Sequence, residues 1–293
     1  MGLLPIVLFA VLAVGVGTLV AARSTRQPAV SPSPEQERVA RTAGRWRLAG
    51  AGTGLVVAVV AAYQGALGRG LLLAAPLFGL CVLAGVIVGE LRVRPNEGAE
   101  RRATLEVRRV HDYLPRALGV TVAAATGVLG VVLVLTTAAG SPDDLGRAGR
   151  ELFRRCSALT AESSGAWPGS FYTVPLAVLV TCGVLIGAVA MIRIVRRPAQ
   201  SGDPAAEEAL RRSAARSVTA AVGILVAVPL AGVGFVAGMS LAGFGCRPEW
   251  WNIPTAALAV VVPTALALAA WCAAVLLAPT PIQAPLSSTP VAR

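Results

Sequence analysis

Seven long apolar segments constrain this chain more than any other feature of its sequence. A transmembrane helix needs about 20 consecutive, mostly apolar residues, and each of the seven segments is close to that length. Only 14% of the residues are charged, against about 25% in an average soluble domain. The sequence therefore predicts an all-α, polytopic membrane bundle of seven transmembrane helices. Their expected bounds are 3–22, 48–66, 71–91, 117–138, 173–192, 218–240 and 254–278.

The distribution of arginine predicts how these helices are oriented. The chain has 26 basic residues, all of them arginine, and 19 fall in three connections, residues 23–47, 92–116 and 193–216. Cytoplasmic loops of membrane proteins collect positive charge. We therefore place these three connections in the cytoplasm, the N-terminus outside and the C-terminus inside. On this interpretation the net charge of +11 reflects topology and does not indicate nucleic-acid binding.

The first apolar segment is expected to be retained as a helix. It has no charge before its apolar run and carries Arg23 and Arg26 after it, which is the reverse of a cleaved secretory signal. Arginine in place of lysine, together with abundant Ala, Gly and Val, is typical of a GC-rich genome. We therefore expect a bacterial cytoplasmic membrane as the location, with the lipid bilayer as the first partner.

The segments also share a repeated pattern. Aligning Pro5 with Pro175 without gaps places Arg23 on Arg193. The sequence predicts three parallel two-helix repeats, related by an axis along the membrane normal, followed by a seventh helix. The expected repeats cover residues 1–68, 70–139 and 172–240. Two explanations of these repeats remain open: a duplication that serves only helix packing, and an arrangement that encloses a functional central cavity.

The cytoplasmic connections are predicted to contain basic helices. Ser33-Pro34 and Asp203-Pro204 each combine an N-cap residue with proline at the first helical position, so helices two and six should begin in the cytoplasm. Acidic and basic residues then recur four apart, which favours a helix. Arginines on such helices would attract anionic lipid headgroups on the inner face, although topology alone also explains them. The arginines concerned are Arg41, Arg45, Arg108, Arg116, Arg212 and Arg216.

Glycine pairs four residues apart predict close helix contacts. Such pairs let two helix backbones approach closely inside a membrane. We expect them to pack helices within one chain, with dimerisation as the alternative. The pairs are Gly85 with Gly89, Gly183 with Gly187, and Gly234 with Gly238.

The largest outer connection, residues 139–172, is predicted to contain an amphipathic helix. Ser141-Pro142 looks like a helix start, and apolar residues from Leu145 to Leu159 then recur at spacings of three and four. This helix could lie on the lipid surface, and we favour the alternative in which it caps the bundle. The tail, residues 279–293, is expected to be disordered.

Two of the five cysteines are predicted to form a disulfide. Cys156 and Cys246 are the only cysteines placed outside the cell by the predicted topology, and disulfides persist in such a compartment. Their bond would fasten the outer connection to the turn between helices six and seven. Free thiols are the alternative.

The sequence lacks the residues that most intramembrane chemistry requires. Without lysine there is no Schiff base or Walker A site, and the single histidine, His111, lies in a cytoplasmic connection. We therefore expect no catalytic residues, no cofactor and no metal. Asp143-Asp144 is the one pair of acids on the outer face, and it more closely fits a helix start than a divalent-cation site.

Glu90 is the only carboxylate at the end of a predicted span. The repeat places it at the depth of Arg23 and Arg193, so these three residues are a candidate cytoplasmic gate. An ordinary interfacial ion pair is the alternative.

These observations predict a multi-pass membrane protein without a catalytic site. We expect a non-catalytic accessory subunit that binds a protein partner in a bacterial envelope or transport complex. The alternative is a permease for a small molecule or lipid, which would use an axial cavity between the repeats.

Overall fold

The computed structural model describes residues 34–64, 66–92, 116–165, 167–196 and 204–277. Six of its helices are long and apolar enough to cross a membrane, as expected of a multi-pass membrane protein, and they correspond to predicted spans two to seven. The first predicted span and the tail lie outside the described residues. The elements are α2 (Pro34–Gln64), η1 (Ala66–Gly68), α3 (Arg69–Arg92), α5 (Arg116–Ala139), β1 (Leu152–Arg155), β2 (Ala161–Ser164), α6 (Ser170–Arg196), α7 (Pro204–Gly243), η2 (Glu249–Trp251) and α8 (Asn252–Leu277).

Two helices extend well beyond their apolar segments. Helix α2 begins at Pro34 and has 31 residues, and α7 begins at Pro204 and has 40 residues. With a rise of 1.5 Å per residue, α7 is about 60 Å long, about twice the thickness of a bilayer core. The prediction that these two helices start at a proline and continue without a break into the apolar segment is confirmed.

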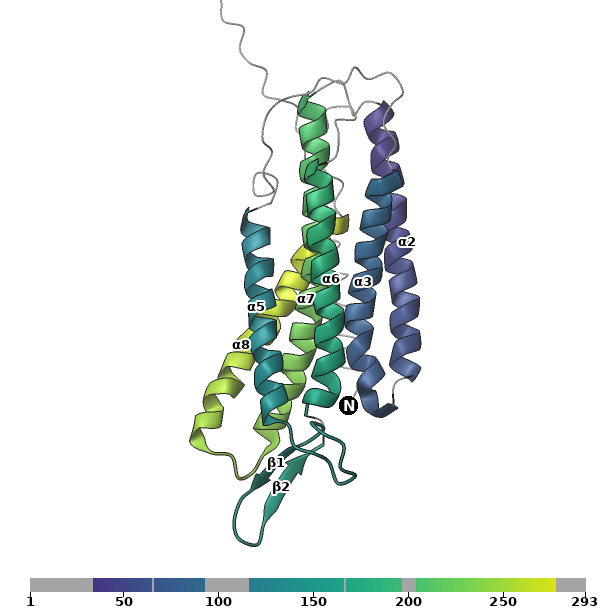
Figure 1. Ribbon diagram of the computed structural model, residues 1–293. Coiled ribbons are helices and arrows are strands. Elements are labelled where there is room, and N and C mark those ends of the chain that lie inside the picture. The colour runs from purple at the N-terminus through teal and green to yellow at the C-terminus, as the bar shows by residue number, and fades with distance from the viewer. Residues whose placement is uncertain (1–33, 65, 93–115, 166, 197–203, 278–293) are drawn as a thin grey trace, which may run out of the picture.

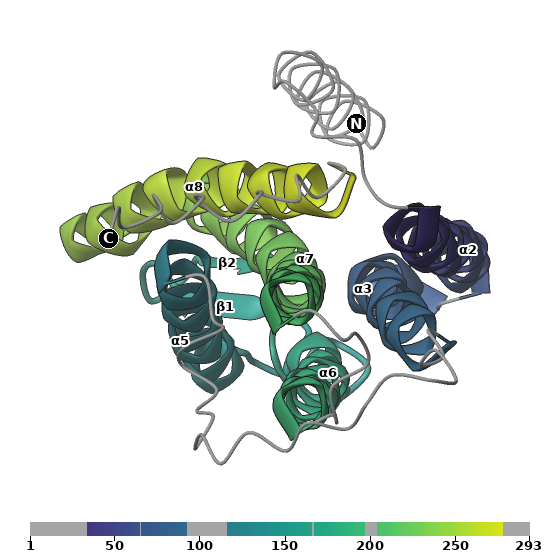
Figure 2. The same ribbon diagram turned by 90° about the horizontal axis from the view of Figure 1, so that it is seen from above.

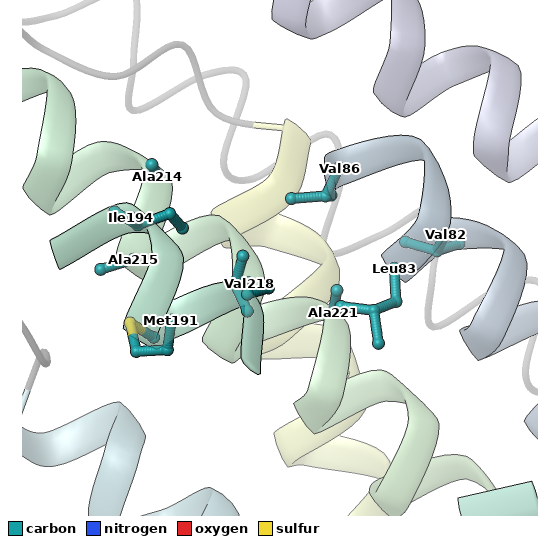
Figure 3. Packing of buried hydrophobic residues seen from close by; sticks show 10 residues of the cluster. Val82, Leu83, Val86, Met191, Ile194, Ala214, Ala215, Val218 and Ala221 are labelled. Carbon is teal, nitrogen blue, oxygen red and sulfur yellow. The ribbon is translucent and has the colours of Figure 1, made fainter. Parts of the chain in front are cut away.

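Helix α7 is the centre of the described bundle, and α3, α5, α6 and α8 surround it (Figure 2). In its most apolar 18-residue window 72% of the residues are buried, whereas in α2 the figure is 6%. Three apolar clusters connect α7 to its neighbours. In one of them Val218 and Ala221 of α7 lie between Leu83 of α3 and Met191 of α6 (Figure 3). The core is thus organised around one helix.

Glycine permits the closest of these helix contacts. A Cβ atom on Gly85 of α3 would lie 2.6 Å from the Trp46 carbonyl oxygen of α2, and one on Gly79 would lie 2.7 Å from the Cα of Leu225 in α7. Neither position has space for a larger residue. Gly183, Gly187, Gly234 and Gly238 likewise face side chains of neighbouring helices. All three predicted glycine pairs therefore pack against other helices of the same chain.

The connection between α5 and α6 is a β hairpin, so the predicted amphipathic helix in residues 139–172 is wrong. Strands β1 and β2 pair antiparallel, with Leu152 opposite Ser164. Leu145 and Leu159, which the helical spacing placed on an apolar face, are 71% and 97% exposed. Gly146 and Gly149 take φ angles of 75° and 66°, and this left-handed conformation interrupts a helix.

The predicted repeats do not appear as matching helix pairs in the described bundle. The second repeat joins α3 to α5, but these two helices make little direct contact, because α6 and α7 lie between them. The third repeat joins α6 to α7, which do pack along each other. The repeat therefore stays a prediction from the sequence.

The bundle has two chemically different ends (Figure 1). We call the end that carries β1 and β2 the hairpin end, and the other the arginine end. Helices α2, α5 and α7 begin at the arginine end, and α3 and α6 finish there. The arginine end carries Arg38, Arg41, Arg45, Arg47, Arg92, Arg116, Arg193, Arg196, Arg211, Arg212 and Arg216.

Candidate functional site

The hairpin end holds the most elaborate polar structure among the described residues. We call the connection between α5 and α6, residues 140–169 without residue 166, the hairpin cap. It lies beyond the ends of α5, α6 and α7 (Figure 1). The expected amphipathic helix is thus replaced at this end by a β hairpin, which packs on the ends of α5 and α7.

Asp143 organises the first half of the hairpin cap. Its carboxylate accepts hydrogen bonds from the backbone nitrogens of Leu145 and Arg147, at 3.1 and 2.7 Å. It also forms ion pairs with the guanidinium groups of Arg147 and Arg150, at 2.7 and 2.6 Å. Its side chain is only 1% exposed. Asp143 is therefore a turn-forming acid with its acceptors occupied, and it does not form a cation site with its exposed neighbour Asp144.

These contacts fix the charges of Asp143 and Arg150. Burial opposes ionisation of Asp143, but hydrogen bonds from the Arg147 backbone and from the Arg147 and Arg150 side chains outweigh it and lower the pKa of the carboxyl. The Tyr172 hydroxyl, and after it the Asp143 carboxylate, raises the pKa of Arg150 against the effect of burial. Both groups are consequently charged at neutral pH.

Cys156 and Cys246 lie at disulfide distance, with their Cα atoms 5.7 Å apart. Cys156 directly follows β1, and Cys246 lies in the turn between α7 and α8. Glu162 of β2 reinforces this junction, because its carboxylate accepts hydrogen bonds from the backbone nitrogens of Gly245 and Cys246, at 3.0 and 3.2 Å. The predicted pair is thus brought together, and Glu162 is a further contact that sequence reasoning missed.

Cys156, Glu162 and Cys246 also have the residue types of a metal site. One ligand atom from each lies within 4.8 Å of the others, and thiolates are good zinc ligands. Zinc binding requires the cysteines as thiolates, however, and two cysteines at disulfide distance in an oxidising compartment form a disulfide instead. The arrangement fits a covalent fastening of the cap better than an ion site.

A small apolar cluster lies beneath the hairpin. Leu152 of β1, Trp167 and Trp251 are all less than 10% exposed and pack with Leu241 and Phe244 from the end of α7. The Trp167 ring nitrogen donates a 2.8 Å hydrogen bond to the Thr136 carbonyl of α5. The cluster therefore connects the cap to the ends of α5 and α7 and to the start of α8.

The tip of the hairpin is ordered by hydrogen bonds yet presents an apolar side chain. The backbone nitrogen of Cys156 donates to the Thr160 carbonyl at 2.9 Å, and the Ser157 hydroxyl accepts from the nitrogens of Leu159 and Thr160. Leu159 is 97% exposed, and Phe153 on β1 is 53% exposed. The hairpin thus presents two exposed apolar side chains on an ordered backbone.

Arginines and aromatic rings form a second feature of this end. Arg69, at the start of α3, and Arg150 both lie against the ring of Phe171 in α6, with guanidinium carbons 4.9 and 5.6 Å from the ring centre. The neighbouring Tyr172 donates a 2.8 Å hydrogen bond to the Leu67 carbonyl. Leu67 has a φ of 61°, so this bond holds a strained turn between α2 and α3.

The described residues do not bring the predicted cytoplasmic gate together. Glu90 forms an ion pair with Arg47 of α2, at 3.7 Å, because the glycines of α3 bring the two helices close together. Arg193 is exposed on α6, and Arg23 lies outside the described residues. The repeat alignment compares the end of α3 only with the ends of the first and fifth predicted spans, the second of which is α6. It therefore gives no reason to consider Arg47 of α2 as the partner of Glu90.

The predicted basic helices are largely present at the arginine end. Arg41 and Arg45 lie on α2, Arg116 begins α5, and Arg212 and Arg216 lie on α7, all exposed. Arg108 lies outside the described residues. The acid-before-base spacing is confirmed at Glu208 and Arg212, whose charged groups are 2.5 Å apart. The sequence did not indicate that Arg211, next to Arg212, is buried. Its side chain donates a 2.9 Å hydrogen bond to the Val195 carbonyl near the end of α6.

A shallow apolar groove of about 360 Å³ lies between α5 and α6 near the hairpin end. Leu133, Thr137, Thr173 and Val174 contribute to its walls. The two threonine hydroxyls are 2.6 Å apart, so one donates to the other, and the hydroxyl that accepts this bond has a carbonyl acceptor within reach of its own proton, that of Leu133 for Thr137 or of Gly169 for Thr173. Because these polar groups bond to one another, the groove offers an apolar surface and no free catalytic group.

Comparisons with protein families, with curated proteins and with solved structures find no match to this chain. The functional argument therefore depends on the hairpin end itself: a fastened cap, a buried ion-pair network and an exposed apolar tip.

Proposed function

We propose that this chain is a non-catalytic, multi-pass subunit of a bacterial envelope or transport complex, and that it binds a partner protein through the hairpin cap. The observation that carries the proposal is the fixed β hairpin with Leu159 exposed at its tip. A loop whose only role is to connect two helices needs neither a disulfide, such as Cys156 and Cys246 would form, nor the hydrogen bonds that Glu162 accepts from the turn between α7 and α8. A recognition loop benefits from both, because ordering it in advance lowers the entropic cost of binding.

The proposed location of the cap is outside the cytoplasm. Two observations support this orientation. Most of the described arginines lie at the opposite end of the bundle, as in proteins that keep positive charge in the cytoplasm. The cysteines of the cap also lie at disulfide distance, which suits an oxidising compartment. A fluorescent-protein fusion at the C-terminus should therefore fluoresce, and a C-terminal alkaline phosphatase fusion should be inactive.

The alternative of a permease with an axial cavity has less support. It needs an open path along the axis, and in the described bundle that position is occupied by α7. Its side chains there include Val218, Leu225 and Val233, which are at most 1% exposed. A cavity at the axis would require α7 to be displaced from three apolar clusters at once.

Native electrophoresis of membranes from the source organism tests the partner proposal. The wild-type chain is expected to migrate in a complex clearly larger than itself. Replacing the exposed tip residue, Leu159→Ser, should release it to the mass of the free chain. The matched control is Leu145→Ser, because Leu145 is 71% exposed in the same cap but away from the tip. Free migration of the wild type, or a complex that tolerates Leu159→Ser, would contradict the proposal.

A further inference from the structure

The stack of arginines on Phe171 contains more positive charge than its surroundings neutralise. Arg147 and Arg150 share a single carboxylate, that of Asp143. Arg69 has no acidic group within 4.0 Å in the part of the chain that the structure describes. Two guanidinium groups therefore lie against the Phe171 ring, and the only carboxylate paired with either of them among the described residues, that of Asp143, is shared with Arg147.

These guanidinium groups also have unmet hydrogen-bonding capacity. The Nε atoms of Arg69 and Arg150 are buried and make no hydrogen bond within the described residues. Contact with the face of Phe171 compensates only partly, because a cation–π contact is worth about 0.5–2 kcal/mol. Buried hydrogen-bond donors are normally satisfied, and the half-buried Arg69 has this unmet Nε donor and no carboxylate partner among the described residues. The local structure thus favours an additional anion beside Arg69 and Arg150.

The position of the stack indicates which kind of anion would reach it. Arg69 is the first residue of α3 and Phe171 the second residue of α6, so the stack lies where two apolar helices end. If these helices span a bilayer, this is the depth of the lipid headgroups. Along α6 from Phe171 the surface is apolar, with Val174 and Val178 54% and 57% exposed. A phosphate at the stack could therefore continue into acyl chains along that surface.

We propose that Arg69 and Arg150, stacked on Phe171, bind the phosphate group of an anionic phospholipid. Arginine suits this role because its planar group donates two parallel hydrogen bonds to phosphate. The bound lipid would connect the turn before α3 to α6 and to the hairpin cap. This site is separate from the exposed tip at Leu159 and does not depend on which side of the membrane the cap faces.

Native mass spectrometry of the full-length chain in detergent tests the site. Phosphatidylglycerol and the zwitterionic phosphatidylcholine are titrated against the wild type, Arg69→Gln and Arg155→Gln. Arg155 is the matched control, because it is an exposed arginine of the same cap that stacks on no ring among the described residues. Binding of phosphatidylglycerol should weaken about fivefold in Arg69→Gln, as expected for the loss of one arginine at a lipid surface, and stay unchanged in Arg155→Gln.

Competition by inorganic phosphate and by glycerol phosphate identifies the source of the phosphate. Both should compete weakly if the acyl chains contribute, and strongly if the natural ligand is a soluble phosphate; either result supports a phosphate site. Equal affinity for the two lipids, or equal losses in Arg69→Gln and Arg155→Gln, would overturn it. If Arg69→Gln does not fold, Phe171→Leu replaces it, since this variant removes the stacking surface and keeps the charges.

Discussion

Helices α2 and α7 share the same order of sequence features, but α2 lies at the periphery of the described bundle and α7 at its centre. Both begin at a proline, start with charged turns and continue into an apolar segment. Yet 72% of the most apolar window of α7 is buried, against 6% in α2. Helix α7 contacts four other long helices, whereas α2 packs mainly along α3 (Figure 2).

The comparison teaches that in a membrane protein apolar character does not measure burial. Lipid tails are as apolar as leucine, so both the lipid-facing and the protein-facing side of a helix are apolar. What distinguishes the two helices is the fit of particular residues. Leu225 of α7 is fully buried among small residues of α3 and α6, whereas Val56 of α2 is 63% exposed.

The largest effect is expected from truncating the centre of α7. Leu225→Ala should lower the free energy of unfolding by about 2–5 kcal/mol, because it leaves a cavity in a packed site. Val56→Ala in α2 should change it by less than about 0.5 kcal/mol. Titration with SDS in mixed micelles measures both. Equal effects of the two substitutions would break the comparison between the helices.

The next effect concerns the fastening of the hairpin cap to the end of α7. Replacing both cysteines, Cys156→Ser with Cys246→Ser, should lower the free energy of unfolding by about 2–4 kcal/mol, as for other bonds that close long loops; this one spans 90 residues. The double replacement Cys81→Ser with Cys182→Ser is the control, since the structure places neither sulfur in a bond. Labelling of Cys156 by a thiol reagent without prior reduction would show that no bond is present.

A smaller effect is expected where α3 meets α7. Gly79→Val should cost about 1–3 kcal/mol, the usual range for overpacking, because its Cβ would lie 2.7 Å from the Leu225 Cα. Gly52→Val in α2 is the matched control, since nothing lies within 4 Å of that Cβ position. Thermal melting in detergent should show a lower midpoint for Gly79→Val alone, and a similar loss for Gly52→Val would contradict the assignment of α2 to the periphery.

The smallest effect is expected from mild acidification of the hairpin cap. The pKa of Asp143 is lower in the folded chain than its ordinary value of 3.8. Its contribution to stability is therefore complete above that pH and is lost as the pH falls through the folded pKa. The contribution of Asp143 to the melting midpoint should therefore stay constant between pH 7 and 5 and decrease below about pH 4. The decrease of the melting midpoint at low pH should be smaller in Asp143→Asn. If this variant shows the same dependence of the midpoint on pH as the wild type, the decrease comes from other acidic groups.

The helices were predictable from the sequence because the bilayer imposes a length and a composition on every span. Pro34 and Pro204 even located the first residues of α2 and α7, since proline at the first helical position follows a local rule. Which helix lies at the centre was not predictable. That property depends on close contacts such as those of Gly79 and Gly85, whose partners are distant in the sequence.

The candidate site was predictable in its cysteines but not in its backbone. Cys156 and Cys246 were paired by elimination, as the two cysteines outside the predicted spans. The hairpin was missed because apolar residues at spacings of three and four outweighed the turn signals of Gly146 and Gly149. Of the apolar residues in this short connection, Leu152 packs on Phe244 and Trp251 beyond the connection, whereas Leu145 and Leu159 are exposed. Periodicity within the loop therefore carried little information about its structure.

The hairpin cap also has a mechanical consequence for the whole bundle. It connects the ends of α5, α6, α7 and α8 through Cys156, Glu162 and Trp167. At the arginine end the described helices are held by apolar packing, as of Val86, Ile194 and Ala214, and by individual bonds such as that of Arg211 to α6, without a disulfide among the residues described there. A set of rods fixed at one end can separate only at the other. Any opening of this bundle should therefore pivot about the cap, so that a small rotation there becomes a large displacement at the far end of the 40-residue α7.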